Sequence, residues 1–331
     1  MMQLYLGDAF FSVLGFHVNR HKFTNPDVYD FMESFDSYLG DNSFSSKYLP
    51  WLTQSNFPVI NVNMLADGQT VTLTQNPAAT WIPFQLWFIP LYLRATDQSK
   101  SANNTFEYLI ALSDAKFTFK LPYKSQSWGI EANFNYTAYC LINYGKDPMW
   151  NFAINTAAST SRSTLDRIML VRGVTILAAT TQVLLPQPLK VAQGLFSWFA
   201  TTKSENETVA VLPLMMQRMF DQLIAISLPY NTIFPQFPNR LNKLWPPLLQ
   251  WVGWDDSGSN NLKQIRSSVA FWSVFLNQQD AVNKAISIFT SNPQSVPKTV
   301  QRAVWWAAAQ QNETYQQLIQ LVYSSNFSLL K

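Results

Sequence analysis

The chain has 331 residues, of which 47% are hydrophobic and 15% aromatic, so it can build substantial hydrophobic cores and is not intrinsically disordered. Its formal net charge is only +3, with no cluster of Lys and Arg, which argues against nucleic acid or an anionic membrane as a partner. The single cysteine, Cys140, excludes an internal disulfide framework and a metal site built from several cysteines. A chain of this length predicts two or three domains.

Residues 1–56 place apolar side chains at helical spacing. Two stripes follow this period: Leu4, Phe10, Phe11 and Leu14, and then Val28, Phe31, Met32 and Phe35. The tripeptide Asn25-Pro26-Asp27 between them predicts the end of one helix and the cap of the next. Gly40 directly after Leu39 predicts that the second helix ends at Leu39, with the glycine as its C-terminal cap.

Residues 57–146 change to a period of two, which is typical of strands. Four segments read this way: 59–63, 70–75, 84–93 and 116–121. Asp67-Gly68 between the first two predicts a tight hairpin turn. Short strands separated by turn residues over this length predict a β-sandwich.

Residues 147–331 return to helical spacing, interrupted by many prolines. The last part predicts four successive helices, at 262–276, 280–289, 296–310 and 313–323. Helices of this length punctuated by proline are typical of a stacked antiparallel array. The fold class predicted for the chain is therefore multidomain α+β: a short helical segment, a β-sandwich, and an all-α superhelical array of the HEAT/ARM kind.

The two histidines of the chain, His17 and His21, lie four residues apart. On a helix this spacing puts both imidazoles on one face, as in the His-Glu-x-x-His pair of zinc peptidases. The general base would be a carboxylate next to the first histidine, where this chain has Val18. A third ligand about 19 residues past the second histidine would fall on Gly40. We therefore interpret both histidines as structural.

Three other features are better explained by structure than by chemistry. Cys140 lies in an apolar stretch without a neighbouring base, which favours a buried structural thiol. Asp255-Asp256 lie in a Gly, Ser and Asn-rich loop, which favours turn formation. The tryptophan pairs favour core packing over a ligand cage: Trp251 with Trp254, and Trp305 with Trp306. The sequence thus supplies no catalytic, cofactor-binding or metal-binding residue.

The compartment is indicated by five Asn-x-Ser/Thr sequons, at Asn103, Asn135, Asn206, Asn312 and Asn326. Sequons of this number favour an extracellular or lumenal setting with N-glycosylation at these asparagines. The longest apolar stretch, residues 173–185, is too short to span a bilayer, and no Lys- or Arg-led signal peptide opens the sequence.

Several strings, in order along the chain, resemble the zinc aminopeptidases of the aminopeptidase N and endoplasmic-reticulum aminopeptidase type. These are residues 2–11 (MQLYLGDAFF), 21–25 (HKFTN), 51–60 (WLTQSNFPVI), Trp81-Ile82-Pro83, Asn143-Tyr144 with Trp150, Arg266, Val296-Pro297 and residues 300–303. The segment 133–136 (NFNY) departs from the more regular family pattern. The resemblance divides the chain into residues 1–56, the incomplete end of a thermolysin-like catalytic domain; residues 57–146, the β-sandwich; and residues 147–331, an incomplete α-helical superhelix.

In that family the zinc motif, the third zinc ligand, the Gly-x-Met-Glu-Asn loop and the catalytic tyrosine precede the point that Met1 matches. The resemblance therefore implies a non-catalytic C-terminal portion of a protein that removes N-terminal residues from peptides. It implies no cofactor bound by this chain, zinc belonging to the parent family, and it leaves open whether the chain is itself an enzyme. Without the rest of such a domain, the apolar stripes of the first 51 residues are expected to lack partners.

Two alternatives remain beside this reading. The chain could be a free-standing pseudoenzyme or scaffold that binds peptides or a protein partner through its concave helical surface. It could also hydrolyse a substrate at a site that the sequence does not reveal. The expected partners are peptides, together with the missing catalytic domain or a second copy of the chain. The parent family is anchored at the plasma membrane as an ectodomain.

Overall fold

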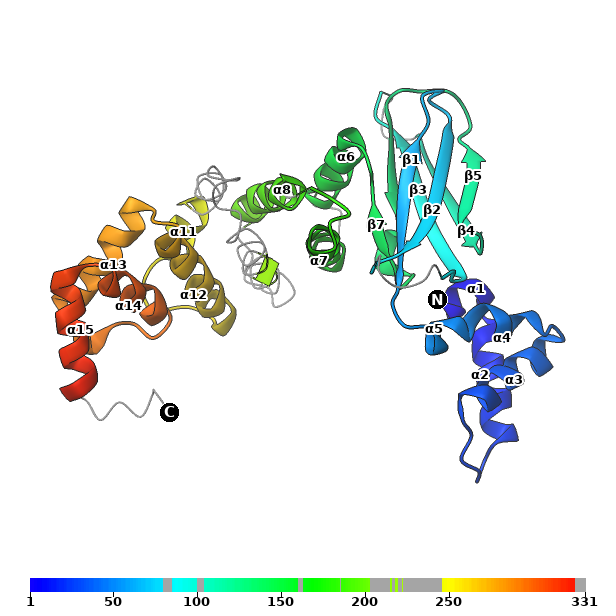
Figure 1. The fold of residues 1–331 in the computed structure, drawn as a ribbon, viewed down its shortest axis with the longest axis horizontal. Helices are drawn as coiled ribbons and strands as arrows, with labels where there is room; N and C mark the ends of the chain where they lie inside the picture. Colours follow the sequence, from blue (N-terminus) through cyan, green and yellow to red (C-terminus); the bar gives the residue numbers. More distant parts are fainter. Residues whose placement is uncertain are drawn as a thin grey trace. The chain divides into compact units, whose positions relative to one another are not determined.

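The computed structural model describes residues 1–79, 85–99, 104–159, 163–184, 186–202, 215, 218–219, 222 and 246–324. The chain divides into two compact units, Met1–Thr156 with Ile176–Val183, and Ala157–Thr175 with Leu184–Lys331. Each unit is described by itself below, with its elements labelled as in Figure 1. The domain limits expected from the resemblance stay a prediction.

The first unit begins with five helices: α1 (Met2–Leu6), α2 (Ala9–Arg20), α3 (Val28–Leu39), α4 (Ser43–Tyr48) and α5 (Pro50–Thr53). The predicted boundary before α3 is confirmed, because the Asp27 side chain accepts hydrogen bonds from the backbone N–H groups of Tyr29 and Asp30. In return the Asp30 carboxylate accepts from the Asp27 N–H, which completes a capping box. The predicted C-terminal glycine is confirmed as well, since Gly40 has the left-handed φ of 66° that favours this residue.

These helices share a small hydrophobic core, so the expectation that their stripes lack partners is wrong for much of the segment. Six buried residues form the core: Val13, Met32, Phe35, Phe44, Tyr48 and Phe88. Phe35 and Phe44 stack with ring centroids 4.4 Å apart. The expectation holds for Phe11, which stays 60% exposed on α2. The reason is that α2 packs through Phe10, Val13 and Leu14, and Phe11 points away from that face.

In the described part of the same unit, seven strands form two small sheets. One sheet has the order β5-β2-β1-β7 and the other β4-β3-β6. The strands are β1 (Pro58–Met64), β2 (Thr70–Pro77), β3 (Ile89–Asp97), β4 (Thr105–Leu112), β5 (Lys116–Lys120), β6 (Trp128–Ala132) and β7 (Leu141–Asn143), with a short 3-10 turn η1 (Phe134–Tyr136) before β7. All neighbours pair antiparallel except β1 and β7. The rings of Tyr108 on β4 and Phe119 on β5 lie 5.2 Å apart and join the edges of the two sheets.

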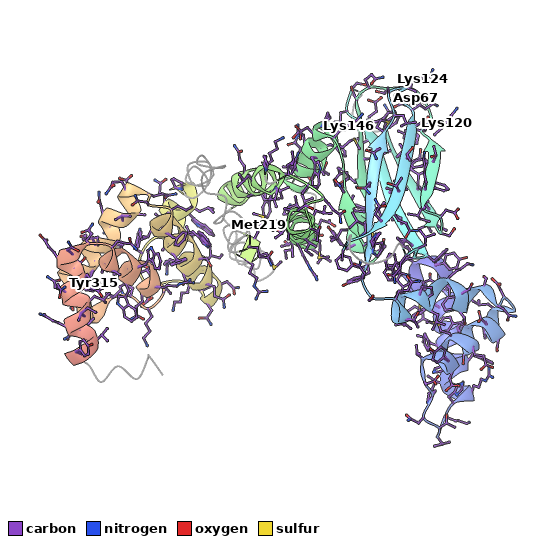
Figure 2. The ribbon with its side chains drawn as sticks, viewed as in Figure 1. Asp67, Lys120, Lys124, Lys146, Met219 and Tyr315 are labelled. Carbon is purple, nitrogen blue, oxygen red and sulfur yellow. The ribbon has the colours of Figure 1, made fainter. Side chains whose placement is uncertain are left out.

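The predicted hairpin between β1 and β2 is confirmed. The Asp67 carboxylate accepts from the Thr70 hydroxyl at 2.5 Å and from the Thr70 N–H at 2.9 Å. These bonds, the hydroxyl first, lower the pKa of Asp67 to about 2. Gly68 has φ of 67°, and a Cβ there would lie 2.9 Å from the Ser125 carbonyl oxygen, so this position requires glycine. Figure 2 shows Asp67 at the same end of the sheets as Lys120 and Lys124.

The strand predicted at 84–93 is displaced in the structure, where β3 starts at Ile89. The buried side chain of Gln75 forms hydrogen bonds with the backbone of the segment that precedes β3. Gln75 accepts from the Trp87 N–H at 3.0 Å and donates to the Trp87 carbonyl oxygen at 3.1 Å. Because both polar groups of Trp87 are bonded to a side chain, this residue cannot join a ladder. Trp81-Ile82-Pro83 lie outside the described residues.

Helices make up the rest of the described chain (Figure 1). They are α6 (Asp147–Ala157), α7 (Thr164–Ala179), α8 (Pro186–Thr202), α11 (Pro246–Val252), α12 (Asn260–Phe275), α13 (Gln279–Ser291), α14 (Gln301–Ala309) and α15 (Asn312–Ser324), with a 3-10 turn η3 (Pro293–Ser295) after α13. The helices predicted at 262–276, 280–289 and 313–323 are confirmed. Fully buried Val269, Ala285 and Val304 contribute to the interior around α12, α13 and α14.

The helix predicted at 296–310 begins only at Gln301. Val296 precedes Pro297 and is extended, with φ −65° and ψ 128°, as a residue before proline prefers. The N–H groups of Lys298 and Thr299 are bound by the side chain of Asp256. The chain is therefore a mixed α and β structure with two small sheets followed by helices. The β-sandwich and the superhelical arrangement of the last helices stay predictions.

Candidate functional site

His17 and His21 lie on α2 with their ring centroids 4.9 Å apart, and both face Ser34 on α3. The buried Ser34 hydroxyl donates its proton to the Asp30 carbonyl oxygen at 2.8 Å. Because that proton is committed, the ring nitrogens donate to the Ser34 oxygen, His17 Nδ1 at 3.0 Å and His21 Nε2 at 3.3 Å. The pair thus holds α2 against α3.

This donor set does not fit a catalytic zinc ion, which needs three protein ligands and an open position. The histidine nitrogens that converge are bonded to a serine hydroxyl, and the position of the general base holds the exposed Val18. Within the described residues, no group of three His, Cys, Asp or Glu side chains could hold a metal ion. The structural interpretation of the two histidines stays a prediction that substitution can test.

Cys140 is 6% exposed and lies next to β7. Burial raises the pKa of its thiol to about 12, so the thiolate, which is the nucleophilic form, is scarce at neutral pH. These surroundings agree with a structural thiol.

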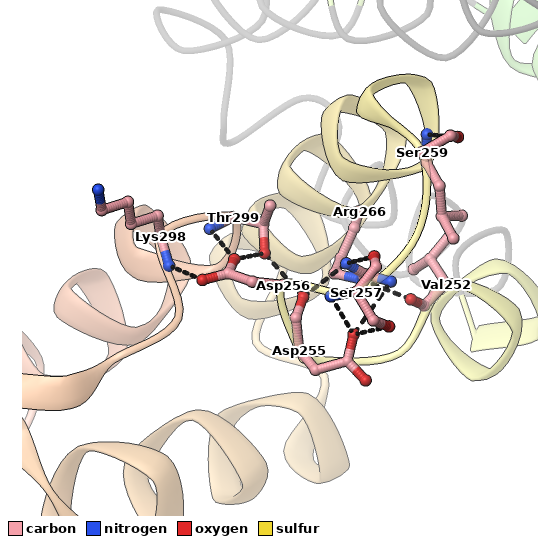
Figure 3. Close-up of polar contacts among 9 residues, drawn as sticks. Val252, Asp255, Asp256, Ser257, Ser259, Arg266, Lys298 and Thr299 are labelled. Carbon is pink, nitrogen blue, oxygen red and sulfur yellow. Dashed lines mark hydrogen bonds and ion pairs between the residues drawn. The ribbon is translucent and has the colours of Figure 1, made fainter.

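Arg266 on α12 is a buried cation of the second unit with several bonded partners (Figure 3). Its guanidinium donates to the carbonyl oxygens of Val252 at 2.6 Å, Asp255 at 2.5 Å and Ser257 at 2.9 Å. An ion pair of 3.3 Å to the Asp255 carboxylate completes the arrangement. A single planar fork therefore fixes the loop that joins α11 to α12.

The neighbouring Asp256 does more than form the turn that the sequence predicts. Its carboxylate accepts from the backbone N–H groups of Lys298 at 2.8 Å and Thr299 at 2.9 Å (Figure 3). It also accepts from the Thr299 hydroxyl at 2.5 Å. This side chain holds the α11–α12 loop and the segment before α14 together, along with a hydrogen bond of 2.8 Å from the Thr299 hydroxyl to the Asp255 carbonyl oxygen.

A pocket of about 440 Å³ lies between the C-terminal end of α11 and the N-terminal end of α13. Most of its surface is apolar, and it is lined by Pro246, Leu249, Gly253, Trp254 and Ala281 together with the polar residues Gln250, Gln278, Gln279 and Asp280. Among the described residues that line it, Asp280 alone is charged. A concave apolar site with few polar groups is the usual form of a ligand pocket. The sequence pattern gave no signal for it, because its two walls are separated by the whole of α12.

The tryptophan pairs are only partly core residues. Trp254 lines the pocket just described. Trp306 stays 40% exposed, although its ring lies 5.4 Å from that of Phe275. The prediction of core packing is therefore too simple for both.

Two of the five sequons fall on described residues. Asn135 is exposed in η1 with a left-handed φ of 56°. Asn312 is exposed at the start of α15, but the hydroxyl of its partner Thr314 is buried and donates to the Ala308 carbonyl oxygen at 2.8 Å. Asn103, Asn206 and Asn326 lie outside the described residues.

None of the helices searched over the described ranges is long and apolar enough to cross a membrane. In a comparison with protein families, residues 130–328 match the model described as the ERAP1-like C-terminal domain. The match covers the end of β6, the whole of β7 and every described helix from α6 to α15, including the Arg266 network and the pocket between α11 and α13.

Proposed function

We propose that this chain, which belongs to the family of proteins with an ERAP1-like C-terminal domain, binds and encloses peptides. That domain is a non-catalytic part of aminopeptidase-family proteins, and the peptides are those on which such proteins act. The observation that supports the proposal is the pocket between α11 and α13, which lies inside the matched domain. Its size suits a peptide side chain and the adjoining backbone. The chain takes part in peptide processing as a binding element, with chemistry left to a zinc site of the parent protein.

The proposal is tested by measuring binding and turnover on the same preparation of the full chain. A library of fluorescent peptides is titrated with the chain and followed by anisotropy, and an amino-acid aminocoumarin amide reports aminopeptidase activity. Saturable binding without turnover is the expected result. Absence of binding across the library would overturn the binding role. Turnover that a chelator abolishes would show instead that the chain is catalytic.

The alternative, a scaffold for a protein partner, is favoured by a specific surface on α2. Phe11 and Val18 lie on one side of this helix and are 60% and 64% exposed, and Phe23 just beyond it is fully exposed. Exposed apolar patches of this kind often mark contact sites. The partner of this surface is either a catalytic domain or a second copy of the chain.

Light scattering after size-exclusion chromatography separates these two partners. A mass that rises with concentration, and falls to that of a monomer in the Phe11→Ser/Val18→Ser variant, would establish a homo-oligomer. Leu165→Ser is the matched control, because Leu165 is 52% exposed on α7. A monomer at every concentration would leave a catalytic domain as the proposed occupant, to be tested by co-expression with the catalytic domain of a zinc aminopeptidase.

The proposed setting is extracellular or lumenal, supported by the exposed Asn135. The chain is to be expressed in the secretory pathway of cultured cells and treated with an N-glycosidase. A mobility shift lost in Asn135→Gln would confirm glycosylation at that residue. Unchanged mobility of the wild-type chain would contradict the glycoprotein assignment.

A further inference from the structure

We propose that the pocket between α11 and α13 selects a cationic side chain of a bound peptide, with arginine preferred. This inference rests on the proposed peptide-binding function and adds a specificity to it. It stands on three properties of the pocket: its apolar walls, the indole of Trp254, and the carboxylate of Asp280.

The walls suit the methylene stem of a long cationic side chain. Pro246 and Leu249 on α11 offer carbon surface on which three or four methylene groups can pack. A volume of about 440 Å³ accommodates one such side chain with its backbone. A short or anionic side chain would leave this surface unfilled or place its charge beside Asp280.

Trp254 supplies the aromatic face. It follows Gly253, which has φ of 71° directly after α11, and it lines the pocket together with Leu249 of that helix. A guanidinium is planar and weakly hydrated, and it stacks on an indole more readily than an ammonium does. This is the physical reason for preferring arginine over lysine.

Asp280 supplies the counter-charge. It is exposed in the first turn of α13, and within the described residues no hydrogen bond or ion pair engages its carboxylate. The neighbouring Asp255 differs, since it is bonded to Ser257 and Arg266. The partial positive charge at the N-terminus of α13 is about half a unit, so the full charge of Asp280 leaves the pocket negative.

A first-turn acid also stabilises a helix by itself, and α15 provides the comparison. Glu313 occupies the first turn of α15 as Asp280 occupies that of α13, and it does not line the pocket. Asp280→Asn and Glu313→Gln therefore remove the same kind of helix stabilisation, and only the first changes the pocket. Comparing the two variants therefore separates an effect on peptide recognition from an effect on the stability of the helix.

The test is anisotropy titration of the full chain with three fluorescent peptides that carry arginine, norleucine or glutamate at one central position. The arginine peptide should bind about tenfold more tightly than the norleucine peptide, the size expected for one charge-assisted hydrogen bond. Asp280→Asn should abolish this preference and Glu313→Gln should keep it. A preference that survives in Asp280→Asn, or equal binding of the three peptides, would overturn the inference and leave the peptide-binding function standing. No binding of any peptide would overturn both.

Two measurements keep the test decisive if Asp280→Asn folds poorly. On the wild-type chain, raising the salt concentration from about 0.05 M to about 0.5 M should weaken the binding of the arginine peptide selectively. The reason is that salt screens the partly exposed pair of the guanidinium and Asp280. A peptide with a photoreactive group next to the arginine should cross-link within residues 246–281, as mapped by mass spectrometry. Cross-links confined to other segments would place the peptide elsewhere and refute the pocket assignment.

Discussion

The carboxylate of Asp256 accepts a hydrogen bond of 2.9 Å from the backbone N–H of Thr299, 43 positions further along the chain. The pKa of Asp256 lies below its ordinary value, and the hydrogen bond from the Thr299 hydroxyl lowers it more than the bonds from the backbone N–H groups do. The contact ties the α11–α12 loop to the segment that precedes α14.

Asp256→Ala should lower the free energy of unfolding by about 1 kcal/mol, because two backbone donors lose their charged acceptor at an exposed site and the Thr299 hydroxyl keeps the Asp255 carbonyl oxygen as its acceptor. Urea unfolding followed by circular dichroism measures the change. Asp114→Ala is the control, since Asp114 is an exposed aspartate between β4 and β5. Equal stability of the two variants would show that the Asp256 contact contributes nothing.

Arg266 is the second test of the same region. Arg266→Met should cost about 3 kcal/mol, because three buried or half-buried carbonyl oxygens lose their donor. Arg266→Lys should recover only part of this loss, since one ammonium cannot reach all three acceptors as the guanidinium does. Thermal unfolding ranks the stabilities of the two variants. Arg172→Met is the control, because Arg172 is exposed on α7. A lysine variant as stable as the wild type would refute the role of the fork.

The thiol of Cys140 should be unreactive while the chain is folded. Burial raises its pKa to about 12, so little thiolate is present at neutral pH. The side chain is only 6% exposed, so a reagent in solution can hardly reach it. An aromatic disulfide reagent at pH about 8 should release less than one tenth of the colour that it releases in guanidinium chloride. Rapid stoichiometric reaction of the native chain would contradict the structural assignment of this residue.

The sequence predicts those elements whose pattern is local. Alternation of apolar and polar residues is sufficient for β1, β2 and β5, and the Asp27 capping box and Gly40 locate the ends of α3. It misses β6, a strand of only five residues that contains Gly129, because glycine disfavours strands and so short a segment carries little pattern. It misplaces β3, because the Gln75 side chain that binds Trp87 lies 12 positions away.

The candidate site depends still more on distant pairs. Asp255-Asp256 in a Gly and Ser-rich loop predict a turn, and the turn is present, but nothing local identifies Thr299 as the partner. The pocket combines Trp254 and Asp280, which α12 separates in sequence and the fold brings to one cavity. The family resemblance, in contrast, could be stated from the strings alone, and the match to residues 130–328 confirms it.

His17 gives a prediction on pH. Desolvation by burial, and then the charge of His21 and of Arg20, lower the pKa of His17 below its usual value of 6.5, while Asp30 opposes the shift. The folded state therefore binds the proton less readily than the unfolded state. As the pH falls through about 6.5, protons bind preferentially to the unfolded chain, so stability falls until the pH passes the lowered pKa of the folded state.

The expected result is a lower urea midpoint at pH about 5 than at pH about 7.5, with a smaller difference in His17→Gln. The charged groups that face the ring are Arg20 and His21 from α2 and Asp30 from α3, with Glu33 paired to Arg20 at 2.8 Å. Lys22→Gln is the control, because Lys22 is exposed in the following turn. If His17→Gln shows the same pH dependence as the wild type, the titration of another group governs stability in this range. If His17→Gln also leaves stability at pH about 7.5 unchanged, the bond to Ser34 does not hold α2 against α3.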